Sequence, residues 1–474
     1  MNISNKQLFL ILLYLAIINA YLIFPVEYLP EEKYKIFLNR KPEDETKEEM
    51  LQRLYYRILM TQIELGTPKK TFTFLLDSDD DRYFVASSLP PKININEREK
   101  EAVYYNFDKS ELLNESYSST YKKGPCEAVD YNTFHYAELC TAKDIALFNQ
   151  NNQKIEKKFE FRMVRINEDS IPGFLGLLYN YRYTRTKHPN FINELRGQNL
   201  IENNYWFFDF KKVSPFNRIL EGNLVIGGLP HEIYPERFKK DDYVILHKSK
   251  RAHFHGSWKV EFKSIEVDDK DYTYLLSNTA CVLNYEMYNI IGSLEFHFRI
   301  KENYLEDLLA EKKCFAGKLQ QHIHYRKELT FYYCNKDMKD FLYKNLPNIK
   351  FHVEDSDQVF ELTKEELFYE KGDYIYLMVL FGGIEFNYFS LGQMFTTKYQ
   401  FVFNTFYKEI GFYKNIERKN MLNYNSLYGM AIIVIPFISL FIGIIIGKKI
   451  FGKKGKKKDG EELIDKSEIE LKNV

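Results

Sequence analysis

The sequence predicts a fold built mainly of β-strands. Tyrosine and phenylalanine are abundant, with 37 and 39 copies among 474 residues, and aromatic side chains favour strands over helices. Two runs of β-branched and apolar residues, Tyr56–Leu65 and Thr71–Leu76, lie on either side of a Gly66-Thr67-Pro68 turn, as expected for two neighbouring strands. The chain length fits about three average domains or two large β lobes.

The composition gives no sign of a nucleic-acid binder. Lys plus Arg and Asp plus Glu each number 66, so the formal net charge is +0, and 45% of the residues are hydrophobic. That apolar share is ample for large cores. Because the chain has no excess of positive charge, it lacks the electrostatic signature of nucleic-acid binding. We therefore expect no nucleic-acid partner.

The first 20 residues are predicted to be a signal peptide. After Lys6, the apolar run Leu8–Ile18 is short and nearly unbroken, and it closes on Asn19-Ala20, as secretory signals do. An N-terminal membrane anchor is the alternative, but the run is short for crossing a bilayer. With cleavage after Ala20, residues 21–54 form an N-terminal segment ahead of the folded body.

A second apolar run near the C-terminus is predicted to span a membrane. Leu427–Ile446 is long enough to cross a bilayer, and we expect a transmembrane helix over residues 427–447. Seven lysines follow in the first part of the tail, residues 448–474, and such clusters stay on the cytoplasmic side. The sequence thus predicts a single-pass type I membrane protein of the secretory or endosomal system or the cell surface, with its body in the lumen or outside the cell.

Five cysteines in an oxidising compartment predict disulfides. Cys126 with Cys140 and Cys314 with Cys334 are close pairs in sequence, each able to link a hairpin or loop. Cys281 is left over, and we expect a small buried core residue there in preference to a catalytic thiol. No Cys/His spacing is typical of a zinc site, so we predict no metal site and no cofactor.

One N-glycosylation signal falls in the predicted lumenal body. It is Asn114-Glu115-Ser116, which makes Asn114 the predicted acceptor. The motif is short and agrees with the predicted compartment.

The stretch Thr61–Ser88 carries a resemblance to a known family. Gly66-Thr67-Pro68, then an apolar strand ending in Leu75-Leu76, then Asp77 resemble the active-site strand of the pepsin-like (A1-type) eukaryotic aspartic proteases. By this resemblance Asp77 is the first of two catalytic aspartates, one from each lobe. The two share a proton, so that one stays acidic while the other activates water.

Further stretches resemble motifs of the family in the expected order, over about Tyr55 to Tyr413. The resemblance implies an all-β, bilobal pepsin-like fold with short helices, with an N-terminal lobe over residues 55–216 and a C-terminal lobe over residues 217–415. The family's propeptide would lie in residues 21–54, which are short and no more basic than acidic. The motifs are Tyr117–Tyr121, Pro172–Leu177, Phe191–Asp209, Gly222–Gly228, Leu346–Phe351, Leu391–Phe395 and Ile410–Phe412.

Tyr131 falls at the offset of the tyrosine in the family's flap, a hairpin that leans over the catalytic water. Such a tight hairpin normally has glycine at its tip, which supplies a positive φ. Residues 131–140 contain no glycine, so we expect a wider turn or a flap that does not close. The alternative, an ordinary core tyrosine, stays open.

The second catalytic aspartate is missing from the predicted position. The candidate strand is Tyr272–Leu283, whose Leu275-Leu276 pair repeats Leu75-Leu76, and the next residue is Ser277. A serine hydroxyl can hold a water but cannot share an acidic proton with Asp77. At the two turns Asp79 and Thr279 replace the family's glycines, and Asp79 adds like charge beside Asp77.

The sequence therefore favours a catalytically inactive, membrane-anchored homologue that binds a peptide or protein segment in the cleft between the lobes. One alternative is an aspartic endopeptidase with residual activity centred on Asp77. Another is a structural or adhesive surface protein that uses its outer face. We expect a monomer in each case.

Overall fold

The computed structural model describes residues 20–30, 34–35, 47, 51, 57–78, 83–88, 104–105, 112–131, 135–165, 173–179, 190–214, 219–246, 257–267, 270–271, 280–321, 327–346, 348–353, 357–383 and 388–414. They belong to one compact unit, Met1–Ile416. The predicted transmembrane segment, the lysine-rich tail and all but the last residue of the predicted signal peptide lie outside these residues. Within the described ranges, no helix is long and apolar enough to cross a membrane.

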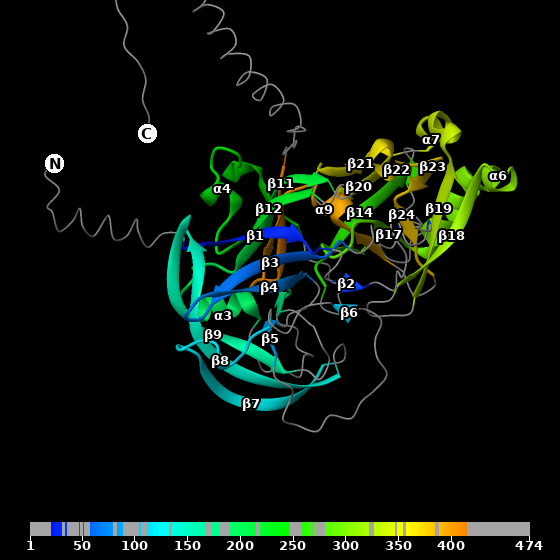
Figure 1. The fold of residues 1–474 in the computed structure, drawn as a ribbon. Helices are drawn as coiled ribbons and strands as arrows, with labels where there is room; N and C mark the ends of the chain where they lie inside the picture. Colours follow the sequence, from blue (N-terminus) through cyan, green and yellow to red (C-terminus); the bar gives the residue numbers. More distant parts are fainter. Residues whose placement is uncertain are drawn as a thin grey trace, which may run out of the picture. The chain divides into compact units, whose positions relative to one another are not determined.

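One large sheet contains most of the strands of the N-terminal half (Figure 1). Its strand order is β13-β27-β26-β11-β12-β1-β3-β4-β10-β5-β9-β8-β7. The strands are β1 (Leu22–Tyr28), β3 (Leu59–Leu65), β4 (Lys70–Asp77), β5 (Tyr83–Ser87), β7 (Lys122–Tyr131), β8 (His135–Gln150), β9 (Gln153–Arg165), β10 (Gly173–Gly176), β11 (Tyr205–Ser214), β12 (Ile219–Ile226), β13 (Tyr243–Leu246), β26 (Phe401–Asn404) and β27 (Glu409–Tyr413).

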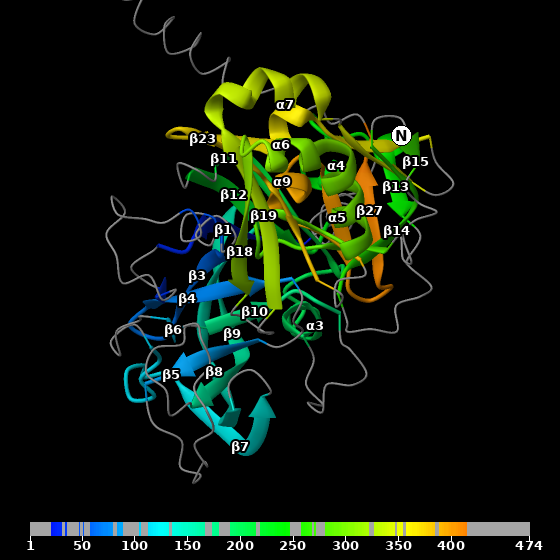
Figure 2. The same cartoon turned by 90° about the vertical axis from the view of Figure 1, so that its right-hand side faces the viewer.

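A second large sheet is built from the C-terminal half, in the order β21-β20-β14-β16-β25-β17-β24-β19-β23-β22, with β15 paired to β14 and β18 to β19. Figure 2 shows β18 and β19 side by side as a long hairpin. The strands are β14 (Lys259–Val267), β15 (Lys270–Asp271), β16 (Ala280–Leu283), β17 (Ile290–Gly292), β18 (Cys314–Gln321), β19 (Lys327–Asn335), β20 (Ile349–Val353), β21 (Val359–Leu362), β22 (Phe368–Lys371), β23 (Tyr374–Leu377), β24 (Val379–Phe381) and β25 (Phe389–Leu391). A separate pair joins β2 (Tyr34–Lys35) to β6 (Tyr104–Tyr105).

The helices of the described chain are short. Two of the three seven-residue helices begin with a polar cap: Asn190 Oδ1 accepts the Asn193 N–H at the start of α3, and Ser293 Oγ accepts the Phe296 N–H at the start of α5. The helices are α3 (Phe191–Gly197), α4 (Pro230–Ile233), α5 (Leu294–Ile300), α6 (Glu306–Ala310), α7 (Lys339–Asn345), α8 (Lys364–Leu367) and α9 (Gln393–Thr396), with 3₁₀ turns at Lys240–Asp242 and Lys336–Met338 and a π-helical turn at Lys301–Leu305.

Two large sheets with few short helices confirm the predicted mainly β architecture. Strand patterns explain it locally, since alternate side chains of β14 and of β3 after Met60 are buried while those between them are partly or fully exposed. Trp206 on β11 and Trp258 just before β14 are each no more than 1% exposed and lie edge to face with ring centroids 6.0 Å apart. These aromatic contacts join the two sheets in one core.

The start of the N-terminal segment is an inner strand of the first sheet. β1 lies between β12 and β3, pairing Leu22 with Ile226 and Tyr28 with Leu59. Thr61 Oγ1 also donates to the carbonyl of Pro25 at 2.7 Å. Removing this strand would uncover two sheet edges, so residues 22–28 belong to the folded body.

Candidate active site

Asp77 is the last residue of β4 and leaves the core directly after two buried leucines. Leu75 and Leu76 are 2% and 3% exposed, whereas Asp77 is partly exposed. β4 pairs in parallel with β10, which sets Leu76 opposite Leu175 and Asp77 opposite Gly176. The Leu177 N–H donates to the Asp77 carbonyl at 2.8 Å. The backbone of Asp77 is thus held on the neighbouring strand, as a side chain at a site edge requires.

Ser78 links this first turn to a second one from the C-terminal half of the chain. Its side chain is 1% exposed. The Ser78 N–H donates to Glu286 Oε1 at 3.1 Å, and the Tyr285 N–H donates to Ser78 Oγ at 3.4 Å. These reciprocal contacts join residues more than 200 positions apart in the chain. Sequence reasoning missed both Tyr285 and Glu286, because neither residue type marks an aspartic protease turn.

The second turn begins at Asn284, where β16 ends. β16 pairs in parallel with β25, with Leu283 opposite Leu391, and the Asn284 N–H donates to the Leu391 carbonyl at 3.0 Å. The next residue after Leu391 is Gly392, just as Gly176 follows Leu175 on β10. By this register Asn284 takes the place in the second sheet that Asp77 takes in the first. Ser277, Thr279 and Asp79 lie outside the described residues, so the predictions made for them stay predictions.

Gly392 lets three carbonyls approach the second turn closely. A Cβ at this position would lie 2.2 Å from the Asn289 carbonyl oxygen and 2.7 Å from those of Met287 and Tyr288. The predicted Leu391–Phe395 motif therefore supports the turn that follows Asn284, because only glycine leaves room for this backbone contact.

Tyr285 is anchored in the core instead of being directed to the solvent. It is 3% exposed. Gln393 Nε2 donates to the carbonyls of Tyr285 and Arg57, each at 2.6 Å, and Tyr28 Oη donates to Gln393 Oε1 at 3.0 Å. The Gln393 amide thus ties the second turn to β1. The Tyr285 ring packs with the rings of Trp206, Phe208, Phe210 and Phe403.

Two turns, one from each half of the chain, therefore meet at Asp77-Ser78 and Asn284-Glu286. The sequence model of the family described as eukaryotic aspartyl protease matches residues 58–415. The chain belongs to this family. The comparison with curated proteins gave no match.

The hairpin predicted to be the flap is β7–β8. Its pairing runs from Lys122 with Lys143 to Tyr131 with His135, and Figure 1 shows β7, β8 and β9 as long, curved neighbours. The three residues between the strands, 132–134, lie outside the described part of the chain. So does the side chain of Tyr131, and its predicted role over the site stays a prediction.

Both predicted disulfides are present, each across an antiparallel strand pair. Cys126 on β7 bonds to Cys140 on β8, and Cys314 on β18 bonds to Cys334 on β19. Cys281 on β16 is buried and belongs to neither disulfide, as predicted, and burial raises the pKa of its thiol well above the usual value. A neutral, enclosed thiol does not act as a nucleophile.

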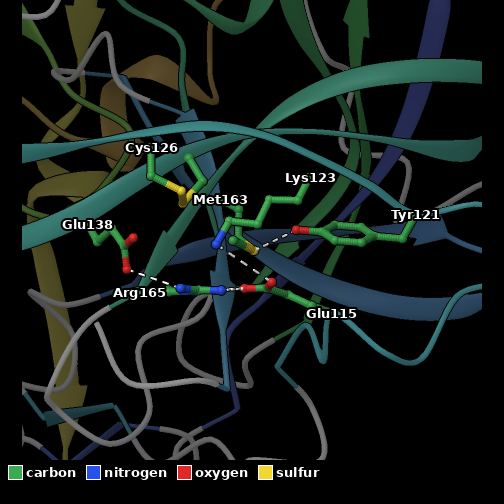
Figure 3. The surroundings of a disulfide bond; sticks show 8 residues. Glu115, Tyr121, Lys123, Cys126, Glu138, Met163 and Arg165 are labelled. Atoms are coloured by element: carbon green, nitrogen blue, oxygen red, sulfur yellow. Dashed lines mark hydrogen bonds and ion pairs between the residues drawn. A yellow bond between two sulfur atoms is a disulfide. The ribbon is translucent and has the colours of Figure 1, made fainter. Parts of the chain in front are cut away.

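Arg165 lies buried beside the flap disulfide (Figure 3). Its side chain is 2% exposed, with Nε donating to Glu115 Oε1 at 2.7 Å and Nη1 to Glu138 Oε2 at 3.1 Å. Burial opposes the positive charge, but the two carboxylates outweigh it and raise the pKa of Arg165. The cluster fixes β9 to the flap hairpin and to the loop before it.

The same region brings Glu138 close to the two flap cysteines, in a group whose ligand atoms lie within 4.8 Å of one another. Cys126 and Cys140 form a disulfide, and a cysteine binds zinc only as a thiolate, so neither sulfur is available as a ligand. The Glu138 carboxylate is bound to Arg165 instead. The group therefore does not suit a metal ion.

Asn114 is exposed on the loop before β7. Its Oδ1 accepts the Ser116 N–H at 3.1 Å and the Ser116 hydroxyl at 2.8 Å. The asparagine and the hydroxyl of the predicted glycosylation signal thus lie together on the surface.

Proposed function

We propose that this protein is a membrane-anchored member of the aspartyl protease family that does not hydrolyse peptides and instead binds an extended peptide or protein segment between its lobes. The observation that carries the proposal is the contrast between the two turns. Asp77 ends its strand with a carboxylate, and Asn284, which carries a neutral amide, directly follows the strand β16 in the second sheet.

Hydrolysis in this family needs two carboxyl groups that share one proton. Ser277, the sequence-based candidate, carries a hydroxyl, and Asn284 carries an amide. Neither group ionises at a working pH, so neither can share an acidic proton with Asp77. Losing one general acid or base costs roughly two to four powers of ten in rate, and a pair that acts as a unit loses more. Inactivity follows whichever of the two residues faces Asp77.

The expected setting is a lumenal or extracellular body held by Leu427–Ile446, as a monomer, with the lysine-rich tail in the cytoplasm. The exposed Asn114 signal supports this compartment. Digestion with an N-glycosidase should lower the apparent mass of the protein made in eukaryotic cells. The Asn114→Gln variant should show no such shift.

The proposal is tested on the full-length protein in detergent with a library of labelled extended peptides at acidic pH. Binding is measured by fluorescence anisotropy and cleavage by mass spectrometry. We expect saturable binding without products. Turnover that disappears in Asp77→Ala would contradict the proposal.

One observation favours residual aspartic endopeptidase activity as a second candidate. Glu286 brings a carboxylate to the N–H of Ser78, the residue next to Asp77. An inhibitor with a central hydroxyl, which mimics the transition state, separates the two functions. Tight binding that Glu286→Gln abolishes would favour the enzyme, because the inhibitor's hydroxyl is held by a pair of carboxyls.

A further inference from the structure

We infer that Asn284 is the residue that faces Asp77 across the two halves of the site, and that Glu286 replaces a missing hydroxyl in the contact that holds the turns together. The inference rests on the proposed function, because it says how the family's acid pair has become an acid–amide pair in this chain.

The strand register is the first step of the argument. On β4 and β10, the pair after Leu76–Leu175 is Asp77–Gly176. The register of β16 and β25 ends at Leu283–Leu391, the next residues are Asn284 and Gly392, and the Asn284 N–H donates to the Leu391 carbonyl. Both pairs of strands are parallel, and a parallel register advances one residue on each strand together. Asp77 and Asn284 are therefore equivalent positions.

The contacts between the turns give a second, independent argument. The residue after Asp77 is Ser78 and the residue after Asn284 is Tyr285, and these two are joined by the Tyr285 N–H donating to Ser78 Oγ. Because Ser78 and Tyr285 are in contact, the residues that directly precede them, Asp77 and Asn284, approach each other from the two lobes. A partner seven residues earlier, at Ser277, does not fit this contact.

The hydrogen bonds of Asn284 fix what its side chain offers. Oδ1 accepts the Glu286 N–H at 2.7 Å, and the other polar atom of the amide, Nδ2, is a hydrogen-bond donor. An ionised carboxylate accepts hydrogen bonds and donates none. Asn284 and Asp77 are thus complementary without a shared proton, and an amide does not titrate.

Glu286, and not Tyr285, supplies the side-chain acceptor for the backbone N–H of Ser78. Ser78 supplies a short hydroxyl to the backbone of the second turn. Tyr285 has no short hydroxyl to return, since its ring packs in the aromatic core. The Glu286 carboxylate reaches back and accepts the Ser78 N–H. We therefore assign Glu286 a positioning role between the two turns.

A charge swap between positions 77 and 284 tests the inference in the full-length protein. The variants are Asn284→Asp, Asp77→Asn and the double swap, with Ser277→Asp as the matched control at the sequence-based position. Melting temperature is measured in detergent from about pH 4.5 to pH 7. Two facing carboxyls raise the pKa of one of them, so the Asn284→Asp protein should lose stability relative to the parent as the pH rises.

We expect Asn284→Asp to melt about 2 °C or more lower than the parent at pH 7, with the difference shrinking toward pH 4.5. The double swap leaves one carboxylate and should remove this pH dependence. Ser277→Asp should show no dependence on Asp77. If Ser277→Asp couples to Asp77 and Asn284→Asp does not, or if neither couples, the inference is wrong. A positioning role for Glu286 further requires that Glu286→Gln keeps the coupling and Glu286→Ala weakens it. None of these results depends on peptide binding or turnover, which test the proposed function separately.

Discussion

The two turns that meet at the site are built from the same strand geometry but from different side chains. The first, Asp77-Ser78, has small polar residues that leave the carboxylate partly exposed. The second, Asn284-Tyr285-Glu286, has a buried aromatic ring at Tyr285 and a carboxylate at Glu286 that accepts the Ser78 N–H. This difference teaches that a scaffold can keep the geometry of a catalytic turn while its side chains are used for packing.

The largest expected effect is the loss of the Tyr285 ring. Tyr285→Ala should destabilise the protein by about 3–5 kcal/mol, because it leaves a cavity among Trp206, Phe208 and Phe403. Chemical denaturation of the full-length protein measures this. Tyr407 is 64% exposed, and Tyr407→Ala should cost less than about 0.5 kcal/mol. Equal losses in the two variants would mean that the second turn is not anchored in the core.

Gly392→Ala should destabilise the second turn by about 3 kcal/mol, because its Cβ would meet backbone atoms that cannot rotate away. The control is Gly383→Ala, where a Cβ would meet nothing within 4 Å. That variant should stay within about 0.5 kcal/mol of the parent. A well-folded, fully stable Gly392→Ala protein would contradict the close approach of residues 287–289.

Removing the hydrogen bond between the Ser78 N–H and the Glu286 carboxylate should have a smaller effect on stability. Glu286→Ala removes the acceptor of the Ser78 N–H and should cost about 1–2 kcal/mol. Glu286→Gln keeps an acceptor oxygen and should cost less than half as much. Melting curves of the two variants at the same pH measure the difference. A larger loss in Glu286→Gln would mean that the negative charge, and not the acceptor, matters at this site.

The smallest expected effect concerns two ionisable groups outside the turns, the buried Arg165 and the partly buried His297. Arg165 in the first half keeps its charge between two carboxylates, whereas His297 on α5 is held neutral. Burial, reinforced by Lys301 and Lys318, lowers the pKa of His297 to about 4, and its Nε2 lies 2.6 Å from Tyr332 Oη. The unfolded chain thus binds a proton on this histidine below about pH 6.5 that the folded chain does not.

Stability contributed at His297 is therefore present above about pH 6.5 and is lost as the pH falls toward 4. The loss should be on the order of 1 kcal/mol, since the ring is partly open to solvent. Denaturation of the parent and of His297→Gln at pH 7 and pH 4.5 measures it. The parent should lose more stability on acidification than the variant, and an equal loss would argue against a partly buried, neutral His297.

Much of the fold could be predicted from local patterns. The motif stretch Phe191–Asp209 contains α3 and the start of β11, and the motif Ile410–Phe412 lies in β27. The two disulfides were predictable because each links neighbouring strands of one hairpin, so the cysteines are close in sequence as well as in space. Asp77 could be found because it directly follows a buried apolar strand.

The second turn was harder to predict, and the reason is physical. The pair Leu275-Leu276 repeats Leu75-Leu76, and this likeness favoured Ser277. Ser277 lies outside the described residues, and we infer from the strand register that Cys281-Val282-Leu283 and the Asn284 that follows form the matching strand end. A search for an acidic residue could not find this turn, because an amide stands at its start and a tyrosine and a glutamate follow.

By itself the sequence determined the strands with alternating burial, the hairpin disulfides and the place where Asp77 leaves the core. Each of these depends on residues that are close in the sequence, at most 20 positions apart. Only the tertiary structure decided which residue ends the matching strand in the second half. That choice depends on the pairing of β16 with β25, more than 100 residues later, and on the contact between Tyr285 and Ser78. Both are set by packing between distant segments, and no local pattern encodes a register between strands so far apart.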